Sequence, residues 1–453
     1  MNRSAGILAV AVVTVLGFEA LPARGQGTQE PLTLRRAIEI ALERSPLLKA
    51  AGHELEAAQA SVERARAGFL PRVDFGESFT RSDNPVFAFS SKLNQGRFTQ
   101  NDFAIDRLNA PGATNNFRTS LSLSQPLWTG GKATLGLLRA RLGRDAAAAG
   151  LDRQRHEVIF AVARGYYAVQ LARSELEVAR GAIGAAESNR DLARARFAAG
   201  LVVESDVLSA EVRLATLREQ AITAEGRLAL AGAALNDVMG RPLDAPVEID
   251  EPLRERAERH RGLAEVEALA LDRRPDLRRL RSEEEAQARA VDLARAEFLP
   301  TLNATGSYDV NRRDIVANGQ NSWFVGVALQ WNLFNGLADR ARIAEARAAL
   351  QRTRALRERA ASAVRLEVKE AFLAVSTARE RIAVARRAVA QAEASLRLAQ
   401  DRYAAGLTTI VNLLQTESAL TQARGNLTRA LHDYNLAVAG LELAAGTIDQ
   451  DAF

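Results

Sequence analysis

Two stretches of the sequence are near copies: RFAAGLVVESDVLSAE runs from Arg196 to Glu211, and RYAAGLTTIVNLLQTE runs from Arg402 to Glu417. They lie 206 residues apart, and in each a Gly-Leu pair separates two long segments rich in alanine and charged residues. Segments of this composition favour helix, and glycine accepts the left-handed backbone angles of a sharp turn. The chain therefore contains the same helix-turn-helix tip twice.

The duplication extends over nearly the whole chain. LERSPLLKAA around Pro46 matches LDRRPDLRRL around Pro275, and ARAGFLPRV around Pro71 matches ARAEFLPTL around Pro300, both at a spacing of 229 residues. QPLWTGG, residues 125–131, matches WNLFNGL, residues 331–337, at the 206-residue spacing of the tips. The difference of 23 residues therefore lies between Pro71 and residue 125, as additional loop in the first copy.

The segments before the two tips predict very long helices. Neither residues 133–197 nor residues 338–403 contain a proline, and at about 1.5 Å per residue each would extend about 100 Å. Such a helix requires neighbours, and both copies carry heptads with one seam of large residues and one of small residues. This pattern favours a wall of helices packed side by side, with an isolated antiparallel coiled coil as the alternative. The large seams are Val162, Val169, Leu176 and Ile183 in the first copy and Val368, Val375, Ile382 and Val389 in the second.

Four segments, at about 70–80, 117–127, 299–310 and 322–333, alternate apolar and polar residues as strands with one apolar face do. The first is the weakest, because Glu77 falls on the apolar face. Strands of about ten residues with this alternation suit a membrane β-barrel, and a half-buried soluble sheet is the alternative. Four strands cannot close a barrel, since the smallest use about eight, so several chains would have to share one.

The composition excludes several classes of function. The 60 basic and 55 acidic residues are interleaved, which leaves a net charge of +5 without a basic patch for nucleic acid. No cysteine is present, and His53, His156, His260 and His432 are scattered without metal-ligand spacing. We find no catalytic constellation, so we expect no enzyme activity, no cofactor and no metal.

The order of these features suggests a domain organisation. Residues 1–25 have the apolar run and small residues of a secretory signal peptide. The first repeat is expected to span residues 32–240 and the second residues 261–446, with a linker at 241–260 and a tail at 447–453. Downstream of the signal peptide there is no uninterrupted apolar stretch long enough for a transmembrane helix.

From about residue 32 to residue 445 the chain resembles the TolC-like outer-membrane efflux protein family. PLTLRRAIEIALERSPLLKAA is similar to the opening motif of that family, QPLWTGG to its corner between strand and helix, and RFAAGLVVESDVLSAE to its tip motif. The resemblance implies a mainly α fold with membrane β: two tandem helix-strand-strand-helix repeats, and a homotrimer with a 12-stranded barrel continuous with a long α-helical barrel. It implies an exit duct of a tripartite efflux pump or type I secretion system in the outer membrane of a Gram-negative-type cell. Its partners would be outer-membrane lipid, a periplasmic adaptor and an inner-membrane transporter.

The resemblance also assigns roles to residues at the tips. Gly200, Leu201, Gly406 and Leu407 would form the periplasmic surface that docks the adaptor. Asp206, Tyr403, Asn412 and Gln415 would line the entrance constriction. Well-known members carry acidic residues at the last two positions, so the amides here predict an uncharged ring that does not respond to cations.

Three questions stay open at the level of sequence. A soluble periplasmic coiled-coil adaptor or scaffold would explain the tips and the signal peptide, but it would not explain two strand pairs with lipid-like faces. The segment at about 81–116 is expected to be irregular because of its Asn, Pro and Gly residues. Its phenylalanines, Phe87, Phe89, Phe98 and Phe103, predict packing against the extracellular mouth. The transported substrate is not encoded in any motif that we recognise.

Overall fold

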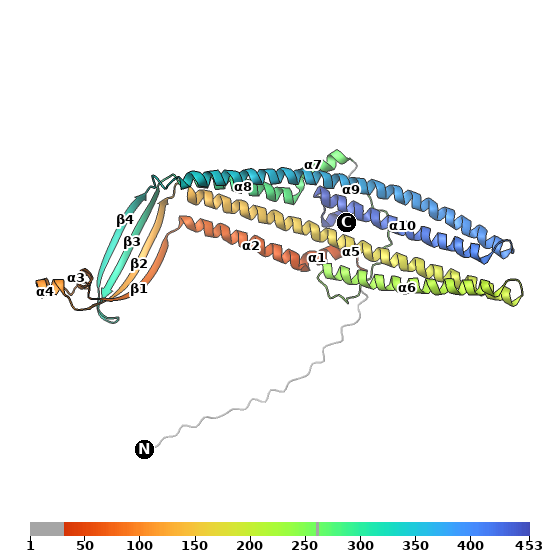
Figure 1. Cartoon of the computed structure of the whole chain (residues 1–453), viewed down its shortest axis with the longest axis horizontal. Helices are drawn as coiled ribbons and strands as arrows, with labels where there is room; N and C mark the ends of the chain where they lie inside the picture. Colours follow the sequence, from red (N-terminus) through yellow and green to blue (C-terminus); the bar gives the residue numbers. More distant parts are fainter. Residues whose placement is uncertain (1–30, 260–261) are drawn as a thin grey trace, which may run out of the picture.

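The computed structural model describes residues 31–259 and 262–453, and the predicted signal peptide lies outside the described residues. The chain is elongated, with a four-stranded sheet at one end and two helical hairpin tips at the other (Figure 1). It has the TolC-like fold that the sequence predicted, with long helices and one antiparallel sheet in each chain.

The two halves of the chain repeat the same main order of two helices, two strands and two helices, to which each half adds short elements of its own. The first half contains α1 (Leu34–Arg44), α2 (Pro46–Arg66), η1 (Ala67–Phe69), β1 (Arg72–Ser82), α3 (Pro85–Asn94), η2 (Gln100–Phe103), α4 (Ile105–Asn109), β2 (Thr114–Trp128), α5 (Lys132–Ala198) and α6 (Glu204–Val238). The second half contains α7 (Leu263–Arg273), α8 (Pro275–Ala296), β3 (Thr301–Arg312), β4 (Gln320–Gln330), α9 (Ala338–Ala404), α10 (Ile410–Ala445) and η3 (Gln450–Ala452).

The matching prolines mark the same break in both halves. Pro46 begins α2 and Pro275 begins α8. The first residues of a helix have no partner within the helix for their N–H groups, so a proline, which lacks this group, costs no hydrogen bond there. The residue before a proline is pushed out of the helical region, so α1 and α7 end there as short helices.

The long helices form a wall rather than a bundle. Both α5 and α9 have 67 residues. Near the tips α5 lies between α6 and α10, and near the sheet it lies between α2 and α8, while α9 packs against α8 and α10 (Figure 1). The seam of large residues is buried, as Val162 and Val368 show. The predicted side-by-side packing is therefore present, and α6 and α9 form the two edges of the wall near the tips.

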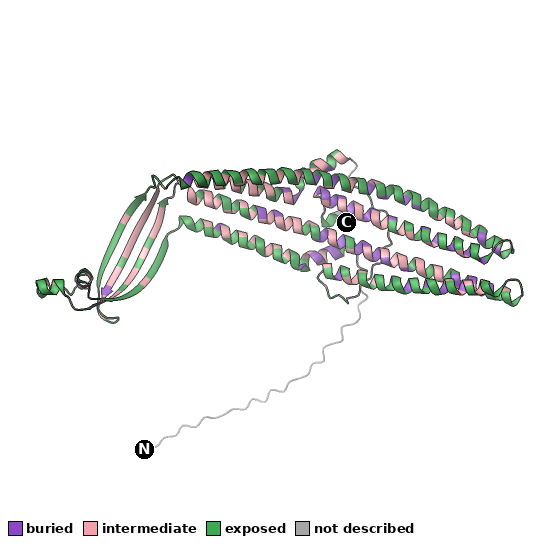
Figure 2. Cartoon of the chain, in the orientation of Figure 1, coloured by how far each residue is buried: buried purple, intermediate pink, exposed green. Residues whose placement is uncertain are grey.

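The largest apolar clusters lie at mid-length, where the short helices α1 and α7 cover the wall (Figure 2). In the first half Ile38 of α1 belongs to one cluster with Val162 and Tyr166 of α5. In the second half Val266 of α7 belongs to one cluster with Val368 of α9. Toward the tips the helices are more exposed, so the middle of the molecule is its most tightly packed region.

The sheet has the order β1-β2-β3-β4, with every neighbouring pair antiparallel. The register places Phe75, Leu121, Tyr308 and Trp323 side by side on one face, and Gly76, Ser120, Asp309 and Ser322 on the other. The first face is apolar and exposed, whereas the second is rich in hydroxyl groups. This is the two-sided pattern of a strand that separates lipid from an aqueous lumen.

Glu77 lies on the apolar face of the sheet, as the sequence predicted, and its carboxylate has partners on strands β2 and β3. Its carboxylate accepts a hydrogen bond from the Thr119 hydroxyl, and Nη2 of Arg312 lies 3.3 Å from its Oε1. The same Nη2 donates to the Thr119 hydroxyl. Three strands therefore share one charged cluster in which the carboxylate is neutralised.

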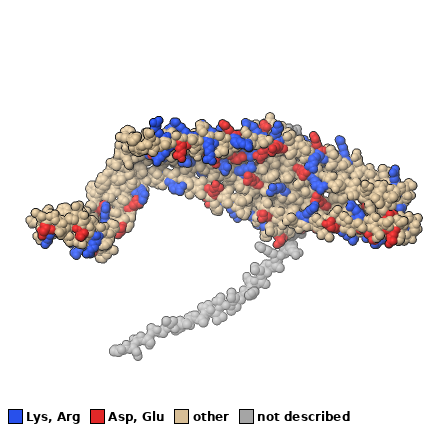
Figure 3. Space-filling model, in the orientation of Figure 1, with Lys and Arg blue, Asp and Glu red and all other residues tan. Residues whose placement is uncertain are grey.

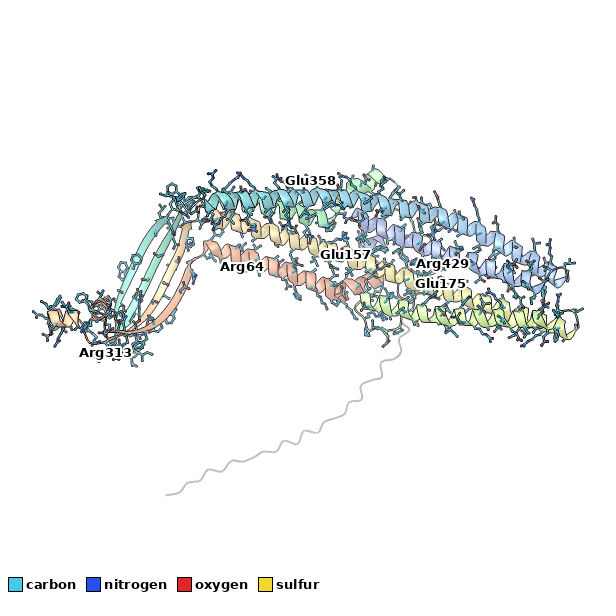
Figure 4. All side chains as sticks on the ribbon, viewed as in Figure 1. Arg64, Glu157, Glu175, Arg313, Glu358 and Arg429 are labelled. Atoms are coloured by element: carbon cyan, nitrogen blue, oxygen red, sulfur yellow. The ribbon has the colours of Figure 1, made fainter. Side chains whose placement is uncertain are left out.

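Replacing Arg312 with leucine should lower the free energy of unfolding by about 1–3 kcal/mol, because Glu77 would remain charged on the apolar face. The double variant Glu77→Leu/Arg312→Leu should recover most of this loss. Urea unfolding of protein refolded into lipid vesicles measures both. Arg313→Leu is the control, because Arg313 lies exposed at the far end of the sheet (Figure 4). A double variant as unstable as the single one would contradict the explanation.

The segment between β1 and β2 is more ordered than predicted. Instead of an irregular loop it contains α3, η2 and α4. The ring centroid of Phe98 lies 4.7 Å from that of Phe89 and 5.0 Å from that of Phe103. These edge-to-face contacts give the segment a small apolar core of its own. From the sequence alone an irregular segment is predicted, because the Asn, Pro and Gly residues carry more weight there than this packing does.

Within residues 31–259 and 262–453, every helix is too short or too polar to serve as a membrane span.

Candidate functional site

The two tips have the same backbone geometry. Gly200 and Gly406 have φ values of 71° and 74°, which an L-residue with a side chain rarely adopts. The N–H of Leu201 donates to the carbonyl of Arg196 at 2.9 Å, and that of Leu407 donates to the carbonyl of Arg402 at 2.8 Å. Each bond satisfies one carbonyl in the last turn of α5 or α9 and helps to turn the chain sharply into the next helix.

Each turn presents an apolar side chain to solvent. Leu201 is 73% exposed and Leu407 is 77% exposed. The turns themselves are already capped by backbone hydrogen bonds, so the two leucines add nothing to the turns. They are available to contact another molecule.

Just behind the turns, the two hairpins share a small apolar core. Residues of all four long helices contribute to it, and it joins the tip of one repeat to the tip of the other. Its buried members are Ala193, Ala210, Ala399, Tyr403, Ile410 and Leu413. The position of one hairpin relative to the other at the tips therefore depends on this core and on the polar contacts around it.

Arg196 makes two of those polar contacts. Its guanidinium, at the end of α5, donates to the carbonyl oxygens of Tyr403 and Ala404 at the end of α9, each at 2.6 Å. The same group lies over the Tyr403 ring, 4.6 Å from its centroid. A cation at the C-terminus of a helix is attracted by the terminal carbonyl oxygens and by the negative end of the helix dipole. Arg196 thus fastens the first hairpin to the second.

Two of the four predicted entrance residues lie beside this contact. Tyr403 is 2% exposed, and its hydroxyl has no hydrogen-bond partner among the described residues. Burial raises the pKa of that hydroxyl, and the carboxylate of Asp206 acts in the same direction. Asp206 is partly exposed in the first turn of α6. The structure therefore brings Asp206, Tyr403 and Arg196 together.

The other two entrance residues lie on the exposed face of α10. The Asn412 side-chain amide donates to the Thr408 hydroxyl at 3.0 Å, a contact within the same tip. Gln415 is exposed one turn further along the helix. Neither side chain takes part in the contact between the two hairpins.

A second polar contact joins the hairpins further from the tips. The Asn189 side-chain amide of α5 donates to the Glu417 carboxylate of α10, and both side chains are buried. Burial raises the pKa of the Glu417 carboxyl, while the hydrogen bond from Asn189 and the charge of Arg213 in α6 act in the opposite direction. An ionisable group is therefore buried where the two hairpins meet.

Beyond this point the surface between the hairpins is a charged groove. It has a volume of about 460 Å³ and is lined by α5, α6 and α10. Glu175 of α5 lies 4.0 Å from Arg429 of α10 (Figure 4). It also lies 3.8 Å from Arg227 of α6. Over the visible surface of the helices, basic and acidic residues alternate without forming a large patch of one sign (Figure 3).

Sequence reasoning missed Arg196, Asn189 and Glu417. Arg196 and Glu417 stand in the two quoted copies, but their counterparts, Arg402 and Glu211, make other contacts or face solvent. No signal in the sequence pointed to Arg196 or Glu417, because both copies carry Arg at the first position and Glu at the last, and only the structure shows that their surroundings differ. Among the described residues no cluster of His, Asp and Glu is arranged to hold a metal ion.

Comparison with known proteins gives a consistent result. The family model described as "Outer membrane efflux protein" matches residues 37–241 and 267–447. Protein CyaE of Bordetella pertussis is 30% identical, over 93% of this chain and 86% of its own length. The alkaline protease secretion protein AprF of Pseudomonas aeruginosa is 26% identical, over 92% of this chain and 85% of its own length. The crystal structure of the outer membrane protein VceC from Vibrio cholerae superimposes with a TM-score of 0.76 at 22% identity, covering 91% of this chain and 96% of VceC.

Proposed function

The chain belongs to the outer membrane efflux protein family, and we propose that three copies of it assemble into one continuous duct from the periplasm to the cell exterior. The protein is an outer-membrane channel of a type I secretion system or an efflux pump, with a periplasmic helical domain, and it is not an enzyme. The number of copies and the identity of the other components belong to the proposal.

The observation that carries the proposal is the open sheet. Among the described strands, β1 and β4 each pair on one side only. The apolar face is exposed: Phe75 is 73% exposed and Trp323 is 76% exposed. Unpaired strand edges cannot face lipid, so the edge of one copy must pair with the edge of another. Three copies would supply twelve strands, which is an ordinary size for a membrane barrel.

The helical wall supports the same assembly. Its edges, α6 and α9, expose large apolar residues along their lengths, which suits contact between α6 of one copy and α9 of the next. On α6 these residues are Leu208, Val212, Ile222 and Leu230, and on α9 they are Leu356, Leu366, Leu373, Val384 and Leu398.

Three copies would present six tips in a ring at the periplasmic end. We assign Gly200, Leu201, Gly406 and Leu407 to docking of a periplasmic adaptor, because each turn exposes a leucine that the fold itself does not use. The adaptor would connect the duct to an inner-membrane transporter, which supplies the energy. Asp206, Tyr403, Asn412 and Gln415 are assigned to the entrance constriction.

The test of the proposal is to express the protein with its own N-terminus, separate the membranes, and measure the native mass of the purified protein in detergent. We expect a trimer from the outer membrane that forms channels in planar bilayers. A monomer in the periplasmic fraction would overturn the duct and favour a soluble scaffold.

The amides at the entrance lead to a separate prediction. Micromolar trivalent cations such as hexamminecobalt should change the wild-type conductance little, because Asn412 and Gln415 carry no charge and Asp206 is the only acidic residue assigned to the constriction. The variant Asn412→Asp/Gln415→Glu would place six carboxylates in the ring of a trimer, and its conductance should fall about tenfold or more in the same solution. A wild-type channel blocked from the periplasmic side would show that other residues line the constriction.

A further inference from the structure

The helical insertion between β1 and β2, residues 83–113, lies over one particular face of the sheet. Gln95, at the end of α3, is buried, and its side-chain amide donates to the side-chain oxygen of Asn116 at 2.9 Å. Asn116 in turn donates to Asn311 at 2.9 Å. The strand register places both asparagines on the polar face: Asn116 lies two residues from Arg118 on β2, and Asn311 lies two residues from Asp309 on β3.

Two further contacts support this placement. Helix α3 touches β2 and also β4, although β3 separates these two strands, so the helix extends across the sheet. A Cβ atom built on Gly96 would lie 2.4 Å from the side-chain oxygen of Gln320, which pairs with Asn311 on the polar face. The insertion is therefore anchored to the side of the sheet that cannot face lipid.

The insertion is a packed unit rather than a loose loop. Besides the edge-to-face contacts among Phe89, Phe98 and Phe103, Lys92 pairs with Asp102 at 2.8 Å. The carboxylate of Asp102 also accepts from the backbone and hydroxyl of Thr99, each at 2.9 Å. Three apolar side chains of the insertion nevertheless remain largely exposed: Val86, Phe103 and Ile105 are 76%, 61% and 76% exposed.

We propose that this insertion partly closes the extracellular mouth of the duct, and that Val86, Phe103 and Ile105 contact their counterparts in the other two copies across the opening. The inference rests on the proposed trimer. In a closed assembly the polar face of each sheet looks toward the other two copies, so a unit anchored on that face projects over the lumen. Exposed apolar residues in that position have two partners available, the other insertions and water.

The absence of cysteine from the sequence permits a direct test. Ile105→Cys, oxidised in isolated outer membranes, should give disulfide-linked dimers on denaturing gels. Val325→Cys is the matched control: it is 71% exposed but lies on the apolar face of β4, and it should stay monomeric. The variant Val86→Ser/Ile105→Ser keeps both the phenylalanine contacts and the anchor at Gln95, and its single-channel conductance should rise about twofold or more.

The outcomes separate this inference from the proposed function. If native mass shows a trimer, yet Ile105→Cys stays uncrosslinked and the serine variant conducts like the wild type, the constriction is overturned while the duct stands. If the thiol of Ile105→Cys resists a water-soluble maleimide but reacts with a lipid-soluble one, the insertion faces lipid outside the lumen and the inference is also overturned. If no trimer forms, the proposed function itself fails.

Discussion

Replacing Arg196 with alanine is expected to open the periplasmic entrance, and the resting conductance of single channels in a planar bilayer should rise accordingly. The substitution removes two charge-assisted hydrogen bonds to the end of α9 and the contact with the Tyr403 ring. Since Arg196 is partly exposed, we expect a loss of about 2 kcal/mol, which corresponds to a shift of roughly 30-fold in the ratio of closed to open tips.

Two variants make the measurement specific. Arg402→Ala removes the counterpart of Arg196 in the second repeat, which is exposed, so its conductance should stay close to that of the wild type. Arg196→Lys keeps the charge but lacks the planar pair of donors, so we expect an intermediate value. If Arg196→Ala and Arg402→Ala behave alike, the contact between the hairpins does not hold the entrance closed.

The variant Asp206→Ala tests whether the carboxylate near Tyr403 also helps to close the entrance. Asp206 lies near Tyr403, and its carboxylate raises the pKa of the tyrosine hydroxyl together with burial. If Asp206 helps to close the entrance, its loss should raise the resting conductance less than the loss of Arg196, because it makes no direct bond to α9. A conductance equal to that of the wild type would leave Asp206 without a role in closure.

The fold could be predicted because its signals are local and periodic. The repeat appears as matched prolines and tips, the strands as alternation, and the wall as two seams of heptads. The side of the sheet that Glu77 occupies was also predictable, but its neutralisation by Arg312 was not. That contact joins β1 to β3 across 235 residues, and no sequence period reports it.

The candidate site was predictable only in part. The tip glycines follow from backbone geometry, so they could be identified from one sequence. Arg196 could not, because the repeat suggests that Arg196 and Arg402 are equivalent, whereas only Arg196 reaches the neighbouring hairpin. The helices α3 and α4 were missed for a related reason: they are short, and the packing of Phe89, Phe98 and Phe103 stabilises them more than their own sequence does.

The buried Glu417 leads to the second large effect, a dependence of closure on pH. Burial raises the pKa of this carboxyl in the packed arrangement. A group that binds its proton more tightly when packed stabilises that packing below its ordinary pKa, and the stabilisation is lost as the pH rises through the raised pKa. We therefore expect the wild-type tips to be held together more firmly in acid, and the resting conductance to rise severalfold between about pH 4.5 and pH 7.5.

Glu417→Gln should remove this dependence. Glutamine keeps an oxygen that accepts the Asn189 hydrogen bond but carries no charge, so the variant should show the low, acid-like conductance throughout the range. Glu211→Gln is the matched control, because Glu211 occupies the same place in the first repeat and pairs with Arg194 at a partly exposed position. Its conductance should follow the wild-type curve.

The charge of Arg213 bears on whether Glu417 stabilises the packing as a neutral acid or as a carboxylate. Arg213 in α6 is the charged group that acts on Glu417, and its buried Nε has no hydrogen-bond partner among the described residues. If attraction to Arg213 outweighed burial, Glu417 would stabilise the packing as a carboxylate, and Glu417→Gln would raise the conductance at neutral pH instead of lowering it. Because burial is the larger influence, we expect the conductance to fall, and Arg213→Met to make the pH dependence of the wild-type channel steeper.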